Sequence, residues 1–200
     1  MYQEISQAIR KIEINKDWLY HWVIDEEMLY SVHKHGILSK SNLRKNNIYF
    51  LRDNSYNVGC NGTEYISVCK KMESNSLAYQ RYIRSNMAFI INPNIDKINS
   101  VMIEKEIKRN AVIEKFFGTK KMLIEEAIVN SPDEFLVKDK ISFNDIIGLK
   151  LPVFYDEDDI SVLIKFLENI NHDLPIIDVE QGIDIDKNKI KNLKIVVENG

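Results

Sequence analysis

Three separate segments of this chain carry side chains that could hold a ligand and assist its chemistry. In the first, His21 follows Leu19-Tyr20 in the aromatic and β-branched stretch Trp18–Val23, which is typical of a buried strand. A histidine on a strand has a fixed direction and can hydrogen-bond a ligand. The alternative for this segment alone is a core histidine whose polar atoms are satisfied by the backbone.

The second segment, Ile48–Tyr56, leads from a short apolar strand into a polar, turn-rich loop. Arg52 could clamp a diphosphate through two parallel hydrogen bonds, and an aromatic ring such as that of Tyr56 could stack on a flat heterocycle. Tyr49 and Ser55 lie in the same segment. The alternative is that Arg52 is a solvated turn residue and Tyr56 covers an edge of the core.

The third segment is the apolar strand Glu134–Val137, which opens with a carboxylate. A glutamate at the start of a strand is held rigidly, which suits a carboxylate that must meet a sugar. The alternative is a glutamate that faces water at a strand end. Glu125 and Glu126 are rival candidates for the same role, because their segment could also be a strand.

Taken together, the order of these segments resembles the ADP-ribosyltransferase superfamily. The matching features are the strand-borne His21, a helix that ends in His35-Gly36, the Tyr49-Phe50 strand with its Arg/Ser/Tyr loop, and the Glu134 strand followed by the apolar strand Ile146–Leu149. Within the superfamily the chain looks most like the DarT-type toxins, which modify nucleic-acid bases. The resemblance implies an α+β fold in which two small, mainly antiparallel sheets with flanking helices enclose an NAD cleft.

The resemblance also implies a role for each matched residue. His21 would hydrogen-bond the adenosine-side ribose of NAD, and Arg52 would contact phosphate. Ser55 or Tyr56 would border the nicotinamide pocket, and Tyr49 belongs to the same cofactor site. Glu134 would hold the nicotinamide ribose and stabilise the oxocarbenium-like transition state, since a negative charge helps most where positive charge develops. No metal is needed for this chemistry.

We therefore expect an enzyme that transfers ADP-ribose from NAD to a macromolecule, either a nucleic-acid base or a protein side chain. An NAD glycohydrolase, with water as acceptor, and a non-catalytic interaction module on a degenerate transferase fold are the alternatives. DNA or RNA is slightly preferred over protein for two reasons. Pro132 stands where arginine-modifying toxins carry a second Glu or Gln, and the basic residues Lys40, Arg44 and Lys45 could position a phosphate backbone. A cognate antitoxin or inhibitor is a further partner that toxins of this kind imply.

The composition narrows the function classes. The 200 residues carry a formal net charge of -3, which gives no long-range attraction to nucleic acid or to an anionic membrane. Cys60 and Cys69 form no CxxC motif and have no histidine pair nearby, which makes a zinc site a poor prediction. No apolar run approaches the roughly 20 residues that span a bilayer, and no signal peptide is evident, so we expect a cytoplasmic protein.

We expect one domain over residues 1–200, with the transferase-like core at about 18–151 and a C-terminal helix and tail at 152–200. Besides the helix that follows Asp25 and stops at Gly36, the apolar spacing predicts other helices. The predicted helices are Tyr2–Ile12, Ser76–Arg84, Glu104–Phe117 and Asp158–Ile170, and the remaining predicted strands are Glu64–Cys69 and Met87–Asn92.

Overall fold

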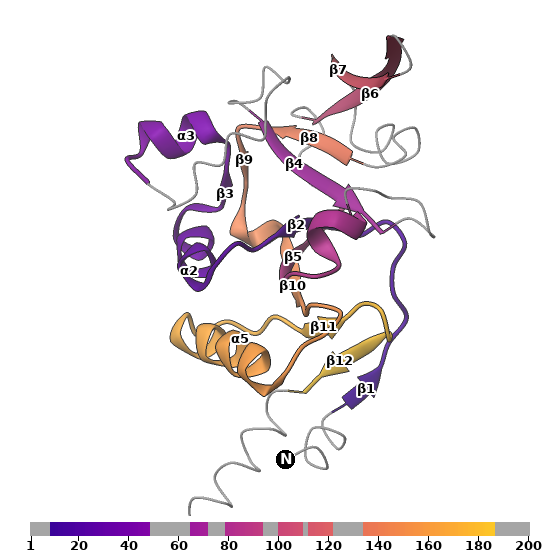
Figure 1. The fold of residues 1–200 in the computed structure, drawn as a ribbon. Helices are drawn as coiled ribbons and strands as arrows, with labels where there is room; N and C mark the ends of the chain where they lie inside the picture. Colours follow the sequence, from indigo (N-terminus) through magenta and orange to yellow (C-terminus); the bar gives the residue numbers. More distant parts are fainter. Residues whose placement is uncertain are drawn as a thin grey trace, which may run out of the picture.

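The structure is a computed structural model, and it describes residues 9–48, 65–71, 79–93, 100–109, 112–121 and 134–186. Within these ranges the chain is α+β, with one large mixed sheet and a separate two-stranded ribbon (Figure 1). The α+β class predicted from the sequence is therefore confirmed. Tyr49, Arg52, Ser55 and Tyr56 lie outside the described residues.

The described strands of the large sheet number ten, and nearly all of them are short. From one edge to the other they are β1 (Ile9–Lys11), β12 (Ile183–Ile185), β11 (Ile176–Asp178), β10 (Ile146–Lys150), β5 (Ala88–Ile91), β2 (Leu19–Trp22), β4 (Tyr65–Lys70), β8 (Glu134–Lys138), β6 (Ser100–Arg109) and β7 (Val112–Lys121). Neighbours in this order are antiparallel except β10 and β11. Those two strands can run parallel because helix α5 (Glu157–Asn169) makes the long crossover that a parallel pair requires.

The sequence led us to expect two small sheets, whereas the described strands, apart from the two-stranded ribbon, join in one large sheet. The link is β2, which hydrogen-bonds along four residues to β5 on one side and along two residues to β4 on the other. Because the backbone of β2 is hydrogen-bonded at both of its edges, β2 joins the strands on its β5 side to the strands on its β4 side. The β2–β4 contact is the shorter one, and it ends at the pair of Tyr20 with Cys69.

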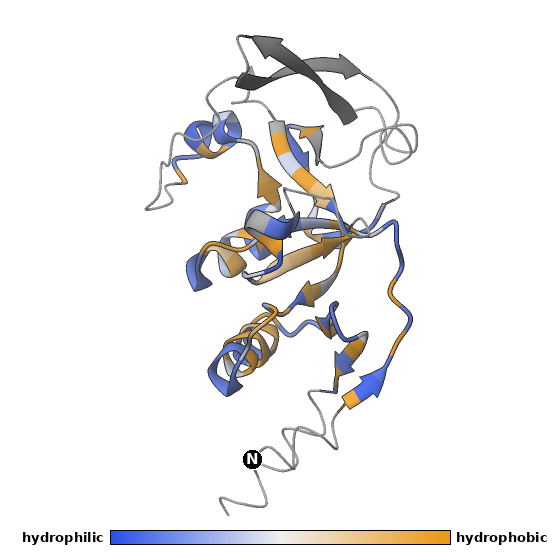
Figure 2. Ribbon diagram, turned by 45° about the vertical axis from the view of Figure 1, so that its right-hand side comes forward, coloured by the Kyte–Doolittle hydropathy of each residue, from blue (hydrophilic) through white to orange (hydrophobic). Residues whose placement is uncertain are grey.

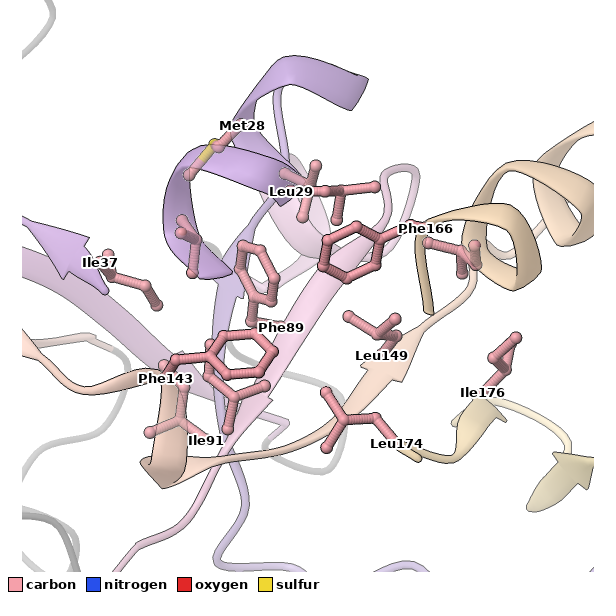
Figure 3. Packing of buried hydrophobic residues seen from close by; sticks show 14 of the residues in the cluster. Met28, Leu29, Ile37, Phe89, Ile91, Phe143, Leu149, Phe166, Leu174 and Ile176 are labelled. Atoms are coloured by element: carbon pink, nitrogen blue, oxygen red, sulfur yellow. The ribbon is translucent and has the colours of Figure 1, made fainter. Parts of the chain in front are cut away.

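Two helices cover one face of the central strands. Leu29 of α2 (Glu26–His35) and Phe166 of α5 pack against Phe89 of β5 and Leu149 of β10, and each of these four side chains is at most 1% exposed (Figure 3). Helix α5 carries hydrophobic residues along one side and hydrophilic ones along the other (Figure 2). The amphipathic helix predicted at Asp158–Ile170 is thus confirmed, and its burial against the sheet is a major source of hydrophobic stabilisation.

The strand–helix–glycine unit predicted around His21 is also confirmed. Asp25 caps α2, and its Oδ1 accepts a hydrogen bond from the backbone N–H of Met28 at 2.9 Å. Gly36 ends the helix with a φ of 79°, and a Cβ at this position would lie 2.4 Å from the carbonyl oxygen of Ile141. Glycine is therefore required here, where the chain turns into the ribbon of β3 (Ile37–Leu38) and β9 (Lys140–Ile141).

Two predicted helices are wrong where the structure describes them. Ile9–Lys11, in the predicted helix Tyr2–Ile12, is strand β1, whose residue Arg10 forms an ion pair with Asp184 of β12. The predicted helix Glu104–Phe117 is replaced by the antiparallel pair β6 and β7. Strand pairing outweighed helical spacing in both places. In β6 and β7 the β-branched residues also favour a strand, and these are Val101, Ile103, Ile107, Val112 and Ile113.

The shorter elements complete the described chain. The predicted helix Ser76–Arg84 is described from residue 79 on, and there it is a single π-helical turn, Tyr79–Ile83. A 3-10 turn, Phe143–Asp145, precedes β10. The basic run after Ser39 is the short helix α3 (Lys40–Lys45).

Candidate functional site

His21 is anchored in one orientation on β2. Its ring Nδ1 lies 2.7 Å from the backbone carbonyl oxygen of Ser67 in β4. A carbonyl oxygen can only accept, so Nδ1 carries the hydrogen and donates it. Nε2 of a neutral ring is then a hydrogen-bond acceptor with a fixed direction, suited to a ligand hydroxyl group.

The surroundings of His21 keep its ring neutral. Burial lowers the pKa of His21 below its ordinary value, and the hydrogen bond to Ser67, which favours the charged ring, offsets only part of this effect. The ring is nevertheless not completely enclosed, since His21 is only partly buried by exposed area. His21 follows Tyr20, the last residue of β2 paired with β4, so it lies where these two strands separate.

Glu134 is the first residue of β8, as predicted, and the register defines its position relative to β2. Cys69 of β4 pairs with Glu134 on one side and with Tyr20 on the other. Two inter-strand steps separate the backbones of Tyr20 and Glu134, which corresponds to about 10 Å. Directly opposite residues share a face, so the Glu134 position belongs to the face of Tyr20 and Cys69, and His21 belongs to the other face.

The other predicted site residues cannot be placed in this geometry. Tyr49, Arg52, Ser55 and Tyr56 are outside the described ranges, as are Glu125, Glu126 and Pro132. The convergence of His21, Arg52 and Glu134 on one cleft therefore stays a prediction.

The basic residues considered for phosphate contact lie on α3. Arg44 and Lys45 are exposed in its last turn, and Lys40 at its start is partly buried. The helix is capped by Ser39, and the side-chain amide of Asn42 donates to the backbone carbonyl of Asp139 at 3.1 Å. Two of the three cations therefore lie on the solvent side of a short, anchored helix.

A groove of about 330 Å³ begins immediately beyond β2, and no pattern in the sequence predicted it. The link from β2 to α2 forms one wall, the turn of residues 85–87 another, and the start of α5 a third. Its polar lining includes the carboxylates of Asp25, Glu26 and Asp159, and its apolar lining includes Ile24 and Val162. In the sequence, Asp25 indicates only the start of a helix.

A buried lysine holds the second wall of this groove. Lys150, at the end of β10, has no exposed area. Its ammonium group donates to the backbone carbonyls of Arg84 and Asn86 at 3.3 and 3.5 Å, and to that of Leu151. The turn that carries Asn86 is therefore fixed from behind, and no sequence signal distinguished Lys150 from a solvated lysine at a strand end.

The face of the sheet that carries Tyr20 has a polar cluster of its own. The hydroxyl of Tyr79 donates to Glu180 at 2.8 Å, and the ammonium of Lys71 lies 3.2 Å from the other oxygen of Glu180. Burial alone would raise the pKa of Glu180, but Tyr79 and Lys71 together lower it below its ordinary value. The Tyr20 ring packs edge-on against Tyr79, and its buried hydroxyl has no hydrogen-bond partner among the described residues.

Comparison with models of protein families and with curated proteins finds no match for this chain. Within the described part of the chain, no group of three His, Cys, Asp or Glu side chains is arranged to hold a metal ion. None of the described helices is both long and apolar enough to cross a bilayer.

Proposed function

We propose that this protein transfers ADP-ribose from NAD to a macromolecular acceptor. The observation that carries the proposal is the state of His21. Its ring is neutral, its Nδ1 is committed to the Ser67 carbonyl, and it lies where β2 and β4 separate. Nε2 is then an acceptor for a ribose hydroxyl, which is the contact that the resemblance to ADP-ribosyltransferases requires of this residue.

The chemistry assigns the second role to Glu134. Its carboxylate would hold the nicotinamide ribose and stabilise positive charge as nicotinamide leaves, and Arg52 would contact the diphosphate. Tyr49, Ser55 and Tyr56 would border the dinucleotide. The acceptor is a protein side chain or a nucleic-acid base, and the sequence preference for DNA or RNA rests on Pro132 and the basic residues of α3.

Incubation with NAD labelled in its adenylate half tests the proposal. Label on an added protein or nucleic acid supports transfer, whereas rapid release of free ADP-ribose supports the NAD glycohydrolase alternative. NAD binding without turnover would support the non-catalytic module.

Three variants assign the roles. Glu134→Gln should reduce turnover by at least about a hundredfold, because lost electrostatic stabilisers of a transition state typically cost that much or more. The matched control is Glu27→Gln, an exposed glutamate in the first turn of α2. His21→Ala should weaken NAD binding, and full activity of Glu134→Gln would transfer the catalytic role to Glu125 or Glu126.

A further inference from the structure

The groove beside β2 is acidic, and its carboxylates form no ion pair within the described part of the chain. Asp25, Glu26 and Asp159 supply these carboxylates. Asp25 and Asp159 each use one oxygen in a helix cap, and the second oxygen of each is left for other contacts.

The residues around the groove add to its negative charge. Glu27 follows Glu26 in the first turn of α2, and Glu157 and Asp158 precede Asp159 in the first turn of α5. Lys150 is buried behind the second wall, and Arg84, which precedes the groove residue Ser85, donates through its guanidinium to Gln80 on its own turn at 3.2 Å. Neither of them lines the groove.

Exposed apolar side chains lie in the groove lining and close to it in the sequence. Ile24, which lines the groove, is 39% exposed, and its neighbour Trp22 is 37% exposed. Phe154, two residues beyond the groove residue Pro152, is 89% exposed. A ligand that fits such a surface carries positive charge and apolar side chains together, as a polypeptide segment with lysine or arginine next to leucine does.

We propose that this groove binds a basic, partly apolar segment of a protein, and that this segment is the acceptor in the transfer reaction. In that step the bond between the ribose C1 and the nicotinamide nitrogen of NAD breaks and nicotinamide leaves. A nucleophilic side-chain atom of the segment bonds to C1 and gives up its proton to solvent. The role as acceptor rests on the proposed function, whereas the binding does not. The groove begins at Val23 and Ile24, two and three residues beyond His21 on the same chain segment, so a bound segment lies close to the candidate NAD site. A nucleic-acid backbone is disfavoured because its phosphates would approach carboxylates that form no ion pair within the described part of the chain.

Binding of a fluorescent lysine–leucine peptide, measured by anisotropy, tests the inference. The comparison probes are a glutamate–leucine peptide and a single-stranded oligonucleotide. The wild-type protein should bind the lysine–leucine peptide in preference to both, and the affinity should fall as salt is added. Preference for the oligonucleotide, or no binding of the basic peptide, overturns the inference without any variant.

A pair of double variants locates the binding. Glu26→Lys with Asp159→Asn should lower the peptide affinity about tenfold. The amide oxygen that Asp159→Asn introduces can still accept the capping hydrogen bond from the Asp156 backbone N–H. The control, Glu27→Lys with Asp158→Asn, makes the same change in charge in the same two helix turns outside the groove lining, and should lower the affinity no more than about threefold. Equal losses in the two double variants place the binding elsewhere and overturn the inference.

NAD cleavage by the wild-type protein, measured with the peptide and with added protein and nucleic acid as acceptors, separates the two proposals. Peptide binding in the groove, with NAD left intact and no acceptor labelled, refutes the transferase and leaves the groove as a peptide-binding site. NAD cleavage without peptide binding refutes the groove. Label on the lysine–leucine peptide, lost in the groove double variant, supports both.

Discussion

The buried ammonium of Lys150 gives the stability of this protein an unusual dependence on pH. Burial lowers the pKa of Lys150 to about 8, and the carboxylates of Glu180 and Asp178 offset only part of that effect. In the unfolded chain the pKa returns to its ordinary value of 10.5. Between these two values the unfolded state binds the additional proton, so stability must rise with pH.

The size of the effect follows from the separation of the two pKa values. Each pH unit well inside this window adds about 1.4 kcal/mol to the free energy of unfolding. Because the folded state begins to lose its proton only near its pKa of about 8, the gain from pH 7 to about 9.5 amounts to about 2 kcal/mol. The upper end of this pH range stays below the titration of Tyr20 and Tyr79, because burial raises the pKa values of both above the ordinary value of 10.0.

Urea unfolding at several pH values measures this contribution. The free energy of unfolding of the wild-type protein should rise relative to that of Lys150→Met by about 2 kcal/mol over this range. The exposed Lys140, changed to Met, is the matched control and should follow the wild type. A constant difference between the wild type and Lys150→Met across the range would refute a depressed pKa for the buried ammonium.

Three further predictions concern the core, a turn and the histidine. Phe166→Ala should cost about 3–5 kcal/mol in urea unfolding because its side chain is 0% exposed, whereas Phe154→Ala, at a side chain 89% exposed, should stay within about 0.5 kcal/mol. Gly36→Ala should cost more than about 2 kcal/mol, because its backbone conformation is essentially restricted to glycine and the new Cβ would meet the carbonyl of Ile141. The pKa of His21 is lowered by burial, so the contribution of its neutral ring to the free energy of unfolding is present above pH 6.5 and is lost as the pH falls. The wild-type free energy of unfolding should therefore fall more steeply than that of His21→Gln between pH 7 and about pH 5.

Sequence reasoning succeeded where a structural element is specified by neighbouring residues. The helix after β2 has a capping aspartate at its start, an apolar stripe and a glycine at its end, all within a dozen residues. Helix α5 likewise has its cap, Asp156, and its buried stripe in one stretch. Such local signals predicted the His21 unit and the amphipathic helix correctly.

Sequence reasoning failed where a structural element exists only because of a partner that is distant in the sequence. Ile9–Lys11 is a strand because β12, more than 170 residues later, pairs with it. Lys150 is buried because the turn at Arg84 and Asn86, more than 60 residues earlier, closes over it. The groove has the same origin, since its carboxylates come from two helices that meet only in the folded chain.

The relative placement of His21 and Glu134 is the non-local feature on which the transferase proposal depends most. Neighbouring strands are rotated by about 20–25°, so the two steps from β2 to β8 do not exchange the faces of the sheet. A dinucleotide that contacts both residues must therefore pass around the point where β2 and β4 separate, just beyond the pair of Tyr20 with Cys69. His21 lies at that point, where β2 is paired with β5 and no longer with β4, and Glu134 is the first residue of β8. If NAD binding fails in His21→Ala and turnover fails in Glu134→Gln, one ligand spans this separation. If only one of the two variants is affected, the sheet separates two unrelated sites.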